Sequence, residues 1–187
     1  MKDTAVALRI VGGSYRGRRL YSLPGRATRP TPEMVREALF NILSGGIAGS
    51  RFTDLFAGTG AVGLEALSRG AARVTFVEKS SGALKVLAKN LALLDCEGRY
   101  RLRPGDAFTC KRVGEEEYIF AAPPYAEMHR MGQLAQHLAR YASPDVCWIL
   151  QHPKAFDISG IARIWELLDT RVYGSNALSF FLKLKEG

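Results

Sequence analysis

The sequence predicts an α/β protein built around a mostly parallel β-sheet that carries helices on both of its faces. Strand-like and helix-like segments alternate from residue 52 to residue 153. Successive parallel strands need a crossover connection, which a helix packed on the sheet normally provides. The chain ends differently, because two strand-like runs flank Gly174-Ser175-Asn176 and predict an antiparallel hairpin at the edge of the sheet.

Two further elements are expected before this alternation. Residues 7–24 read as two short strands around Gly12-Gly13, which together form a β-hairpin arm. A helix should follow, with Thr31 as its N-cap, Pro32 at its first position and Gly45-Gly46 at its end. Its apolar residues recur at helical spacing and are Val35, Ala38, Leu39, Ile42 and Leu43.

The core elements follow in chain order. Strands are expected at 52–58, 73–79, 100–106, 118–124 and 146–153, with two more in the hairpin at 169–185. Helices are expected at 61–70, 82–94 and about 127–141. Because no linker or internal repeat divides the chain, we expect one domain over residues 1–187, with the arm in 1–30 and a helix plus the α/β core in 31–187.

The charge of the chain predicts a polyanionic partner. Formal net charge is +8, and residues 1–36 hold eight Lys or Arg against two acidic residues, which is +6 of that total. Seven of those eight cations are arginine, whose planar guanidinium suits phosphate oxygens. Interleaved glycines and Tyr15 would let a nucleic-acid chain approach closely. The arginines expected to bind RNA are Arg9, Arg16, Arg18, Arg19 and Arg29.

Composition disfavours a membrane protein and a metal site. No apolar stretch approaches the roughly 18 residues of a membrane span, and the apolar run near the start is too short for a secretory signal. We therefore expect a cytoplasmic protein with no membrane partner. Cys96, Cys110 and Cys147 form no C-x-x-C pair, which fits reduced thiols. No His, Cys and Asp cluster has the spacing of metal ligands, so no metal is expected.

The clearest site motif follows the first core strand. Gly58-Thr59-Gly60-Ala61-Val62-Gly63 satisfies G-x-G-x-x-G between a strand and a helix, which is the context of a nucleotide-binding loop. Glu78 ends the next strand, where its carboxylate can hydrogen-bond ribose hydroxyls. Both NAD and S-adenosylmethionine carry an adenosine that such a loop and carboxylate could hold.

Three features favour S-adenosylmethionine over NAD. The loop follows a long basic leader, whereas a dinucleotide-binding domain usually begins close to its glycine loop. The third strand ends in Asp106 and Phe108, which could contact an adenine amino group and ring. The fourth ends in Ala122-Pro123-Pro124-Tyr125, which has no use in hydride transfer. The residues expected at the cofactor are Asp54, Phe56, Gly58, Gly60, Glu78, Lys79, Asp106, Ala107 and Phe108.

Six segments carry a resemblance that covers nearly the whole chain: RIVGGSYRGRRL, TRPTPEMVREALFNIL, DLFAGTGAVGLEALSRGA, FVEKS, GDAF and YGSNALSFF. Together they resemble the bacterial small-subunit ribosomal RNA guanine-N2 methyltransferase family. The resemblance implies a Rossmann-like class I methyltransferase fold, with a seven-stranded sheet whose last strand is antiparallel. It also implies S-adenosylmethionine as methyl donor, and small-subunit ribosomal RNA or an assembling small subunit as partner.

The resemblance also implies a role for the turn after the fourth strand, which in that family is Asp-Pro-Pro-Tyr. An exocyclic amine is a poor nucleophile because its lone pair is delocalised into the ring. Acceptors that take its N–H hydrogens free the lone pair, and a carbonyl of Ala122 or Pro123, held extended before proline, can be one of them. Tyr125 offers a face on which a flipped-out guanine can stack. The expected catalytic residues are Ala122, Pro123, Pro124 and Tyr125.

Two residues depart from the pattern of that family. Ala122 stands where the family has the aspartate, and a methyl group accepts no hydrogen bond. Gln151, before His152, stands where the family tends to have a glutamate. We therefore expect a monomeric RNA methyltransferase whose turnover Ala122 impairs. One alternative is a non-catalytic or substrate-trapping protein that binds RNA and cofactor on the same fold, and another is an NAD-dependent oxidoreductase.

Overall fold

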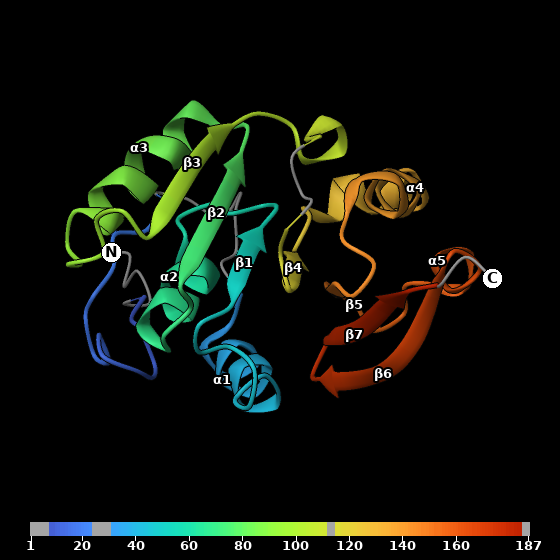
Figure 1. The fold of residues 1–187 in the computed structure, drawn as a ribbon, viewed down its shortest axis with the longest axis horizontal. Coiled ribbons are helices and arrows are strands. Elements are labelled where there is room, and N and C mark those ends of the chain that lie inside the picture. Colours follow the sequence, from blue (N-terminus) through green and yellow to red (C-terminus); the bar gives the residue numbers. More distant parts are fainter. Residues whose placement is uncertain (1–7, 24–30, 112–114, 185–187) are drawn as a thin grey trace, which may run out of the picture.

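The computed structural model describes residues 8–23, 31–111 and 115–184, and a seven-stranded sheet forms its centre (Figure 1). The strands lie in the order β3-β2-β1-β4-β5-β7-β6. Strands β1 to β5 are parallel, whereas β7 lies antiparallel between β5 and β6. The predicted α/β fold class, with its antiparallel last strand, is therefore confirmed. The bounds are β1 Arg51–Asp54, β2 Arg73–Glu78, β3 Tyr100–Pro104, β4 Tyr118–Ala121, β5 Cys147–Pro153, β6 Trp165–Tyr173 and β7 Asn176–Lys183.

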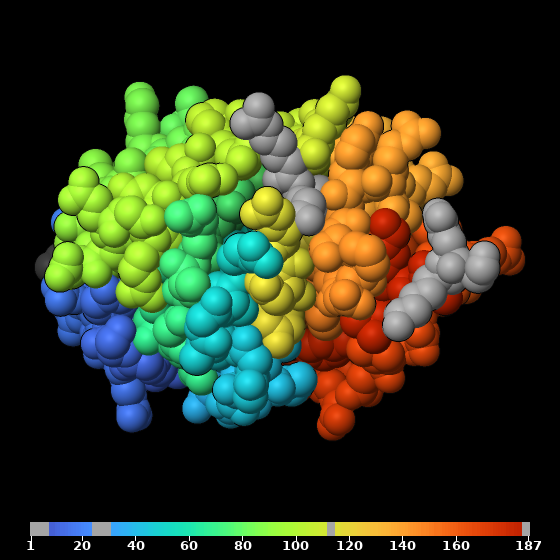
Figure 2. Space-filling model, in the orientation of Figure 1, coloured from blue at the N-terminus to red at the C-terminus, as the bar shows by residue number. Residues whose placement is uncertain are grey.

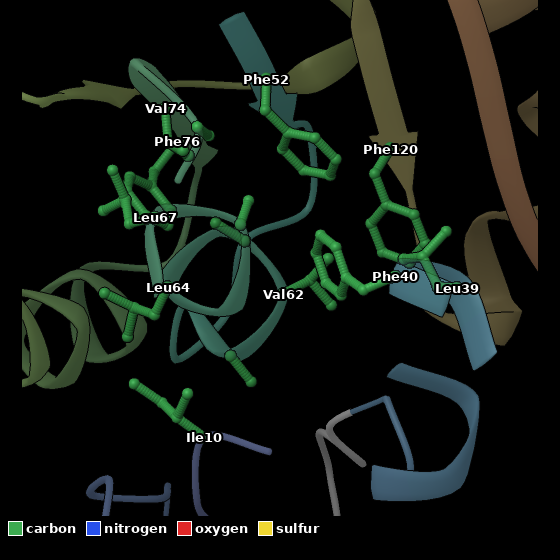
Figure 3. Close-up of a cluster of buried hydrophobic side chains, with 14 of the residues drawn as sticks. Ile10, Leu39, Phe40, Phe52, Val62, Leu64, Leu67, Val74, Phe76 and Phe120 are labelled. Carbon is green, nitrogen blue, oxygen red and sulfur yellow. The ribbon is translucent and has the colours of Figure 1, made fainter. Parts of the chain in front are cut away.

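Three helices cover the first face of the sheet. They are α1 Glu33–Ile42, α2 Ala61–Ser68 and α3 Ser81–Leu91. Side chains of α1 and α2 pack together against those of the central strands (Figure 3). Burial of this apolar surface is the main force that holds the helices on the sheet. The labelled residues of that contact include Leu39, Phe40, Phe52, Val62, Phe76 and Phe120.

The second face carries a separate hydrophobic cluster. It is formed by α4 Met131–Tyr141, the short α5 Ser159–Ala162 and two 3₁₀ helices, η1 Ala107–Thr109 and η2 Tyr125–Arg130. Trp148 and Trp165 meet here edge to face, with ring centroids 5.3 Å apart. The predicted helix at about 127–141 is thus a 3₁₀ turn followed by α4, and α5 was not predicted.

The start and end of α1 differ from the sequence prediction. Pro32 is the N-cap, and no side chain caps the helix. The Thr31 hydroxyl donates instead to Gln151 Oε1 at 2.8 Å, so the prediction of Thr31 as N-cap was wrong. The helix also ends earlier than expected, at Ile42, and Gly45-Gly46 lie in the turn that follows.

The inner face of α1 includes a buried arginine that periodicity does not reveal. Ile42 is 45% exposed, although it was predicted to face the core, whereas Arg36 is only 1% exposed. The Arg36 guanidinium donates to the carbonyls of Thr31 at 2.8 Å and Arg9 at 2.6 Å. These bonds tie the start of α1 to the N-terminal arm.

The described part of the arm, residues 8–23, packs onto the helices. Its two predicted strands are reduced to one antiparallel bridge, between Arg9 and Arg19. Glu65 of α2 is fully buried and accepts the backbone N–H groups of Val11 and Gly12, both at 2.8 Å. A buried carboxylate therefore anchors the backbone of the arm.

Two further side chains hold the arm. The Ser68 hydroxyl, at the end of α2, accepts the Tyr15 N–H at 2.9 Å. The Asn90 amide of α3 accepts the Tyr21 N–H at 2.7 Å and donates to the Tyr21 carbonyl at 3.0 Å. The same amide donates to the Thr59 carbonyl at 2.9 Å, so Asn90 joins the arm to the glycine loop.

We predict that Glu65→Ala lowers the free energy of unfolding by about 3–5 kcal/mol. The substitution leaves the Arg69 guanidinium and the N–H groups of Val11 and Gly12 without the carboxylate that accepts their hydrogen bonds. Arg69 Nε, which donates to Glu65 at 2.9 Å, loses its acceptor in this variant. Urea denaturation monitored by circular dichroism would measure the change. Glu37→Ala, on the exposed side of α1, is the control and should stay within about 0.5 kcal/mol. Equal effects of the two variants would contradict the anchoring role.

Candidate functional site

The candidate site is the rim formed by the carboxyl ends of the parallel strands. The strand order reverses between β1 and β4, and ligands of open α/β sheets bind at such a switch point. Backbone hydrogen bonds continue past the strands and hold the rim together. The Leu55 N–H donates to the Phe120 carbonyl at 2.9 Å, and the Gly105 N–H donates to the Glu78 carbonyl at 3.0 Å. β1 ends at Asp54 and β4 at Ala121, both earlier than predicted, because the residues that follow them form the loops of the rim.

The glycines of the loop after β1 have different structural roles. Gly60 has a φ of 85°, and a Cβ there would lie 2.3 Å from Leu87 Cδ1. A Cβ on Gly63 would lie 2.2 Å from Phe76 Cε1, so Gly63 permits the close approach of α2 to β2. Gly58 also has a positive φ, 54°, but an added Cβ would meet no atom within 4 Å. The space beside Gly58 is therefore open at the rim.

Two carboxylates hold the backbone of this loop. Glu78 accepts the N–H groups of Gly58 and Ser80, each at 2.7 Å, and stays partly exposed. Asp54, at the end of β1, is 2% exposed and accepts the Gly63 N–H at 3.2 Å. Burial raises the pKa of Asp54 to about 7, although the hydrogen bond from Gly63 acts in the opposite direction.

The end of β3 places an acidic and an aromatic residue beside the same loop. Asp106 accepts the Phe108 N–H at 3.1 Å, and both Ala107 and Phe108 are buried. The Arg130 guanidinium lies over the Phe108 ring, 3.6 Å from its centroid. Phe56 meets that ring edge-on, with centroids 5.7 Å apart. Arg130 thus covers the aromatic face that the sequence analysis assigned to a cofactor base.

A row of ion-paired side chains crosses the rim. The sequence analysis did not predict it. Lys79 Nζ lies 2.6 Å from Glu127 Oε1, and Arg130 Nη1 lies 2.9 Å from Glu127 Oε2. Arg130 Nη2 also lies 3.9 Å from Asp106 Oδ2. Hydrogen bonds from Lys79 and Arg130 lower the pKa of Glu127. Glu127 and Arg130 are three residues apart in η2. In the sequence alone, this spacing indicates only an ordinary ion pair on the exposed side of a helix.

The turn after β4 projects from the rim next to the glycine loop. Pro123 is buried, Pro124 is the N-cap of η2, and Tyr125 is 66% exposed. Among the described residues, no hydrogen bond is donated to the carbonyls of Ala122 or Pro123 by a backbone N–H. The Tyr125 hydroxyl lies 3.5 Å from Asn176 Oδ1, at the start of β7. The rim therefore combines two free carbonyls with an exposed aromatic ring.

The two residues that depart from the family pattern both follow the last paired residues of β4 and β5. The register of β4 and β5 pairs Ala121 with Leu150, so Ala122 and Gln151 come directly after this pair. Ala122 packs against the cluster on the first face, and Gln151 accepts the Thr31 hydroxyl from the same side. Spacing in the sequence gave no sign of this proximity, because 29 positions separate the two residues.

His152 is part of the sheet interior. It is 3% exposed, and its Nδ1 donates to the Pro153 carbonyl at 2.8 Å. Nε2 is then the acceptor and takes the Ser179 hydroxyl at 2.8 Å. Burial lowers the pKa of His152. Both ring nitrogens are thus occupied by contacts within the sheet.

The arginines assigned to RNA have different surroundings. Arg9 forms an ion pair with Glu33, with Nη2 and Oε1 2.8 Å apart. Arg16, Arg18 and Arg19 are exposed on the arm. Arg29 lies outside the described residues.

The described part of the chain also bears on metal and membrane binding. Its His, Cys, Asp and Glu side chains form no group of three or more that could hold a metal ion. None of its helices combines the length and apolarity needed to cross a bilayer.

A model of the protein family described as "Conserved hypothetical protein 95" matches residues 8–182. The chain belongs to this family. The matched span includes the described part of the arm, the glycine loop, the turn after β4 and the terminal hairpin up to Leu182, so the strand ends and loops of the rim lie within it.

Relatives of this family member are named as ribosomal RNA methyltransferases. The Bacillus subtilis protein "Putative rRNA methyltransferase YlbH" is 37% identical over 125 residues, which cover 64% of this chain and 68% of that protein. The Escherichia coli "Ribosomal RNA small subunit methyltransferase D" is 41% identical over 120 residues, which cover 63% of this chain but only 60% of that protein.

A solved structure agrees with these relatives. The Escherichia coli protein described as "Putative methyltransferase yhhF" superposes with a TM-score of 0.83 at 29% identity, covering 96% of this chain and 99% of that chain. The likeness to small-subunit ribosomal RNA methyltransferases that the sequence indicated is thereby confirmed.

The raised pKa of Asp54 makes stability depend on pH. Its folded pKa of about 7 exceeds the ordinary value of 3.8, so between these values the folded state binds a proton that the unfolded state lacks. Stability from this group therefore falls as pH rises from about 4 to about 7. Between pH 5 and 8 we expect a loss of about 2–3 kcal/mol that is absent in Asp54→Asn.

Urea denaturation of both proteins across this range is the measurement. Other titrating groups, such as His152, are common to both proteins and cancel in the difference. Parallel stability curves for the two proteins would show that Asp54 is ionised in the folded state throughout.

Proposed function

We propose that this chain transfers a methyl group from S-adenosylmethionine to the exocyclic N2 amine of a guanine in small-subunit ribosomal RNA. The observation that carries the proposal is the meeting of the glycine loop and the Ala-Pro-Pro-Tyr turn at adjacent strand ends, β1 and β4. The names of the relatives support the same reaction class. The identity of the base rests on the sequence resemblance and on the chemistry of the turn.

The rim fits an adenosine-containing methyl donor. The open space beside Gly58 leaves room for a ligand at the backbone of the loop. Each oxygen of Glu78 accepts one backbone N–H and can accept a further hydrogen bond from a ribose hydroxyl. Asp106 is the acceptor assigned to the adenine amine. The remaining residues assigned to the donor are Asp54, Phe56, Gly60, Lys79, Ala107 and Phe108.

A bound donor would supply a methyl group from a positively charged sulfur: the S–C bond breaks as the N–C bond forms, a neutral thioether leaves, and the proton that the amine loses passes to water. The protein's part is to prepare the acceptor amine. A carbonyl of Ala122 or Pro123 accepts one N–H of the amine, which concentrates the lone pair on nitrogen. Tyr125 stacks on the guanine and orients it, and Pro124 stiffens the turn. Positioning of this kind can supply most of the rate acceleration.

The neutral pair Ala122 and Gln151 favours a second candidate function. Neither residue carries a charge, so positions 122 and 151 offer no carboxylate to receive the second N–H of the amine. The Gln151 oxygen is already engaged by Thr31. The chain could therefore bind RNA and cofactor with little turnover, or trap its substrate. An NAD-dependent oxidoreductase has no such support, because the relatives above are named methyltransferases.

The remaining assignments belong to the same proposal. The partner is small-subunit ribosomal RNA or an assembling small subunit, bound in part by Arg9, Arg16, Arg18, Arg19 and Arg29. The chain acts in the cytoplasm as a monomer and as one domain over residues 1–187, with the arm in 1–30. Sedimentation at several protein concentrations would test the monomer.

Transfer of labelled methyl groups to small-subunit RNA and to partly assembled particles tests the reaction. Digestion of the product to nucleosides should yield N2-methylguanosine. A label on another nucleoside would contradict the choice of base, and binding of RNA and donor without transfer would favour the non-catalytic candidate.

Glu78→Ala should weaken binding of S-adenosylhomocysteine by roughly 1.5–3 kcal/mol, the usual contribution of a hydrogen bond to a charged group. Titration calorimetry is the measurement. Glu78→Gln retains one oxygen for the loop and should fall between the two proteins. Glu37→Ala serves again as control and should bind normally. Unchanged affinity in Glu78→Ala would remove this carboxylate from the cofactor site.

Ala122→Asp should raise kcat by about 10²–10³, because it adds a preorganised acceptor aimed at the charge that develops on the amine. KM should change little, since the interaction strengthens only in the transition state. Single-turnover methylation with saturating RNA compares the two forms, and Ala122→Val controls for the larger side chain. If the unmodified protein already matches Ala122→Asp, the carbonyls of the turn suffice and the aspartate is unnecessary.

A further inference from the structure

One half of the sheet's second face is not covered by a helix. In the described residues of the connection from β3 to β4 the only helical turn is η1, and α4 and α5 pack over β4, β5 and β7. β3 contributes no residue to the hydrophobic cluster of this face. In the view of Figure 1 no helix passes in front of β3 and β2. Figure 2 shows the same side of the molecule in space-filling form, where the atoms in the colours of these strands form the surface.

Arginines lie on this uncovered part. Tyr100 and Leu102 pack against the cluster on the first face, so the alternation of side chains along β3 directs Arg101 and Arg103 to the second face. Arg101 pairs in register with Thr75, two residues after Arg73 on β2. Arg73 therefore lies on the same face, diagonally from Arg101.

These three arginines are not neutralised within the described part of the chain. No ion pair involves Arg73, Arg101 or Arg103 there, whereas Arg51 on β1 pairs with Glu115 and Glu117. Arg73 and Arg101 are exposed, and Arg103 is half-buried. The Nε of Arg103 is buried without a hydrogen-bond partner among the described residues.

The position of Arg73 argues against edge protection as the whole explanation. Charged residues on an edge strand prevent pairing with another sheet, and β3 is an edge strand. β2, however, pairs with a strand on each side, so a charge at Arg73 protects no edge. Side chains two residues apart on a strand lie about 6.6 Å from one another, so the three cations form a compact platform on a rigid sheet.

We propose that Arg73, Arg101 and Arg103 form a second RNA-binding surface, which grips the phosphate backbone of the RNA substrate. The partner follows from charge complementarity, since guanidinium groups bind phosphate oxygens in a bidentate manner. The inference rests on the proposed function for the identity of the polyanion. Arg103 is followed by Pro104, Gly105 and Asp106, so this surface leads directly to the rim.

The arm and this surface lie on opposite faces of the sheet. The arm is held by Glu65, Ser68 and Asn90 of α2 and α3, which cover the first face. The β3 edge separates the two. An RNA chain bound at both places would wrap around this edge on its way to the candidate site.

Salt-dependent binding of a labelled small-subunit RNA fragment tests the surface. The triple variant Arg73→Ala, Arg101→Ala, Arg103→Ala should bind at least tenfold more weakly at physiological salt, and its log K against log salt should be shallower by about 2, or 0.7 for each phosphate of a single strand. Replacing the same three residues by lysine should largely keep the slope. Affinity for S-adenosylhomocysteine should be the same in all forms.

The control removes three exposed cations away from β3 and the arm, with Arg140→Ala on α4, Arg163→Ala after α5 and Arg171→Ala on β6, the last of which is ion-paired with Asp169. If the surface triple and this control bind RNA equally well, the proposed surface is wrong, even where methyl transfer proceeds. If the surface triple loses RNA affinity while the unmodified protein transfers no methyl group, the surface stands and the proposed reaction fails.

Discussion

The hydrogen bond from the Gly58 N–H to the Glu78 carboxylate is the contact on which the candidate site depends. It joins the loop after β1 to the end of β2 at 2.7 Å, and the same carboxylate holds Ser80 at the start of α3. The loop can then keep the open space beside Gly58 without a side chain to support it. A donor bound there would meet a backbone that is already in place, and preorganisation of this kind reduces the entropy lost on binding.

Buried and half-buried carboxylates serve the backbone throughout this fold. Asp54 holds the first turn of α2, Glu78 holds the glycine loop, and Glu65 holds the arm. Each satisfies N–H groups that would otherwise be costly to remove from water. Asp54 and Glu65 are thus used inside the molecule, while Arg16, Arg18 and Arg19 of the arm remain exposed.

The structure changes how the residue before the two prolines is understood. Ala122 and Gln151 each follow the last pair of the β4 and β5 register, so two departures from the family pattern fall at the same end of two adjacent strands. If the proposed reaction takes place, it depends on carbonyl acceptors and on stacking by Tyr125. With no carboxylate at positions 122 and 151, the rim carries less negative charge to repel a phosphate backbone. RNA binding becomes easier, but the amine loses an acceptor that would assist catalysis.

The sequence by itself determined the fold class and the strand ends that form the site, because alternating segments and a glycine loop are local patterns with one common solution in parallel sheets. It also indicated the family from motifs spread along the chain. Only the tertiary structure decided which side chains meet. Arg36, which interrupts an apolar helix face, is buried where the carbonyl of Arg9 accepts its guanidinium, and Arg130 lies over the ring of Phe108. Such contacts join residues that are distant in sequence, and no local period or spacing encodes them.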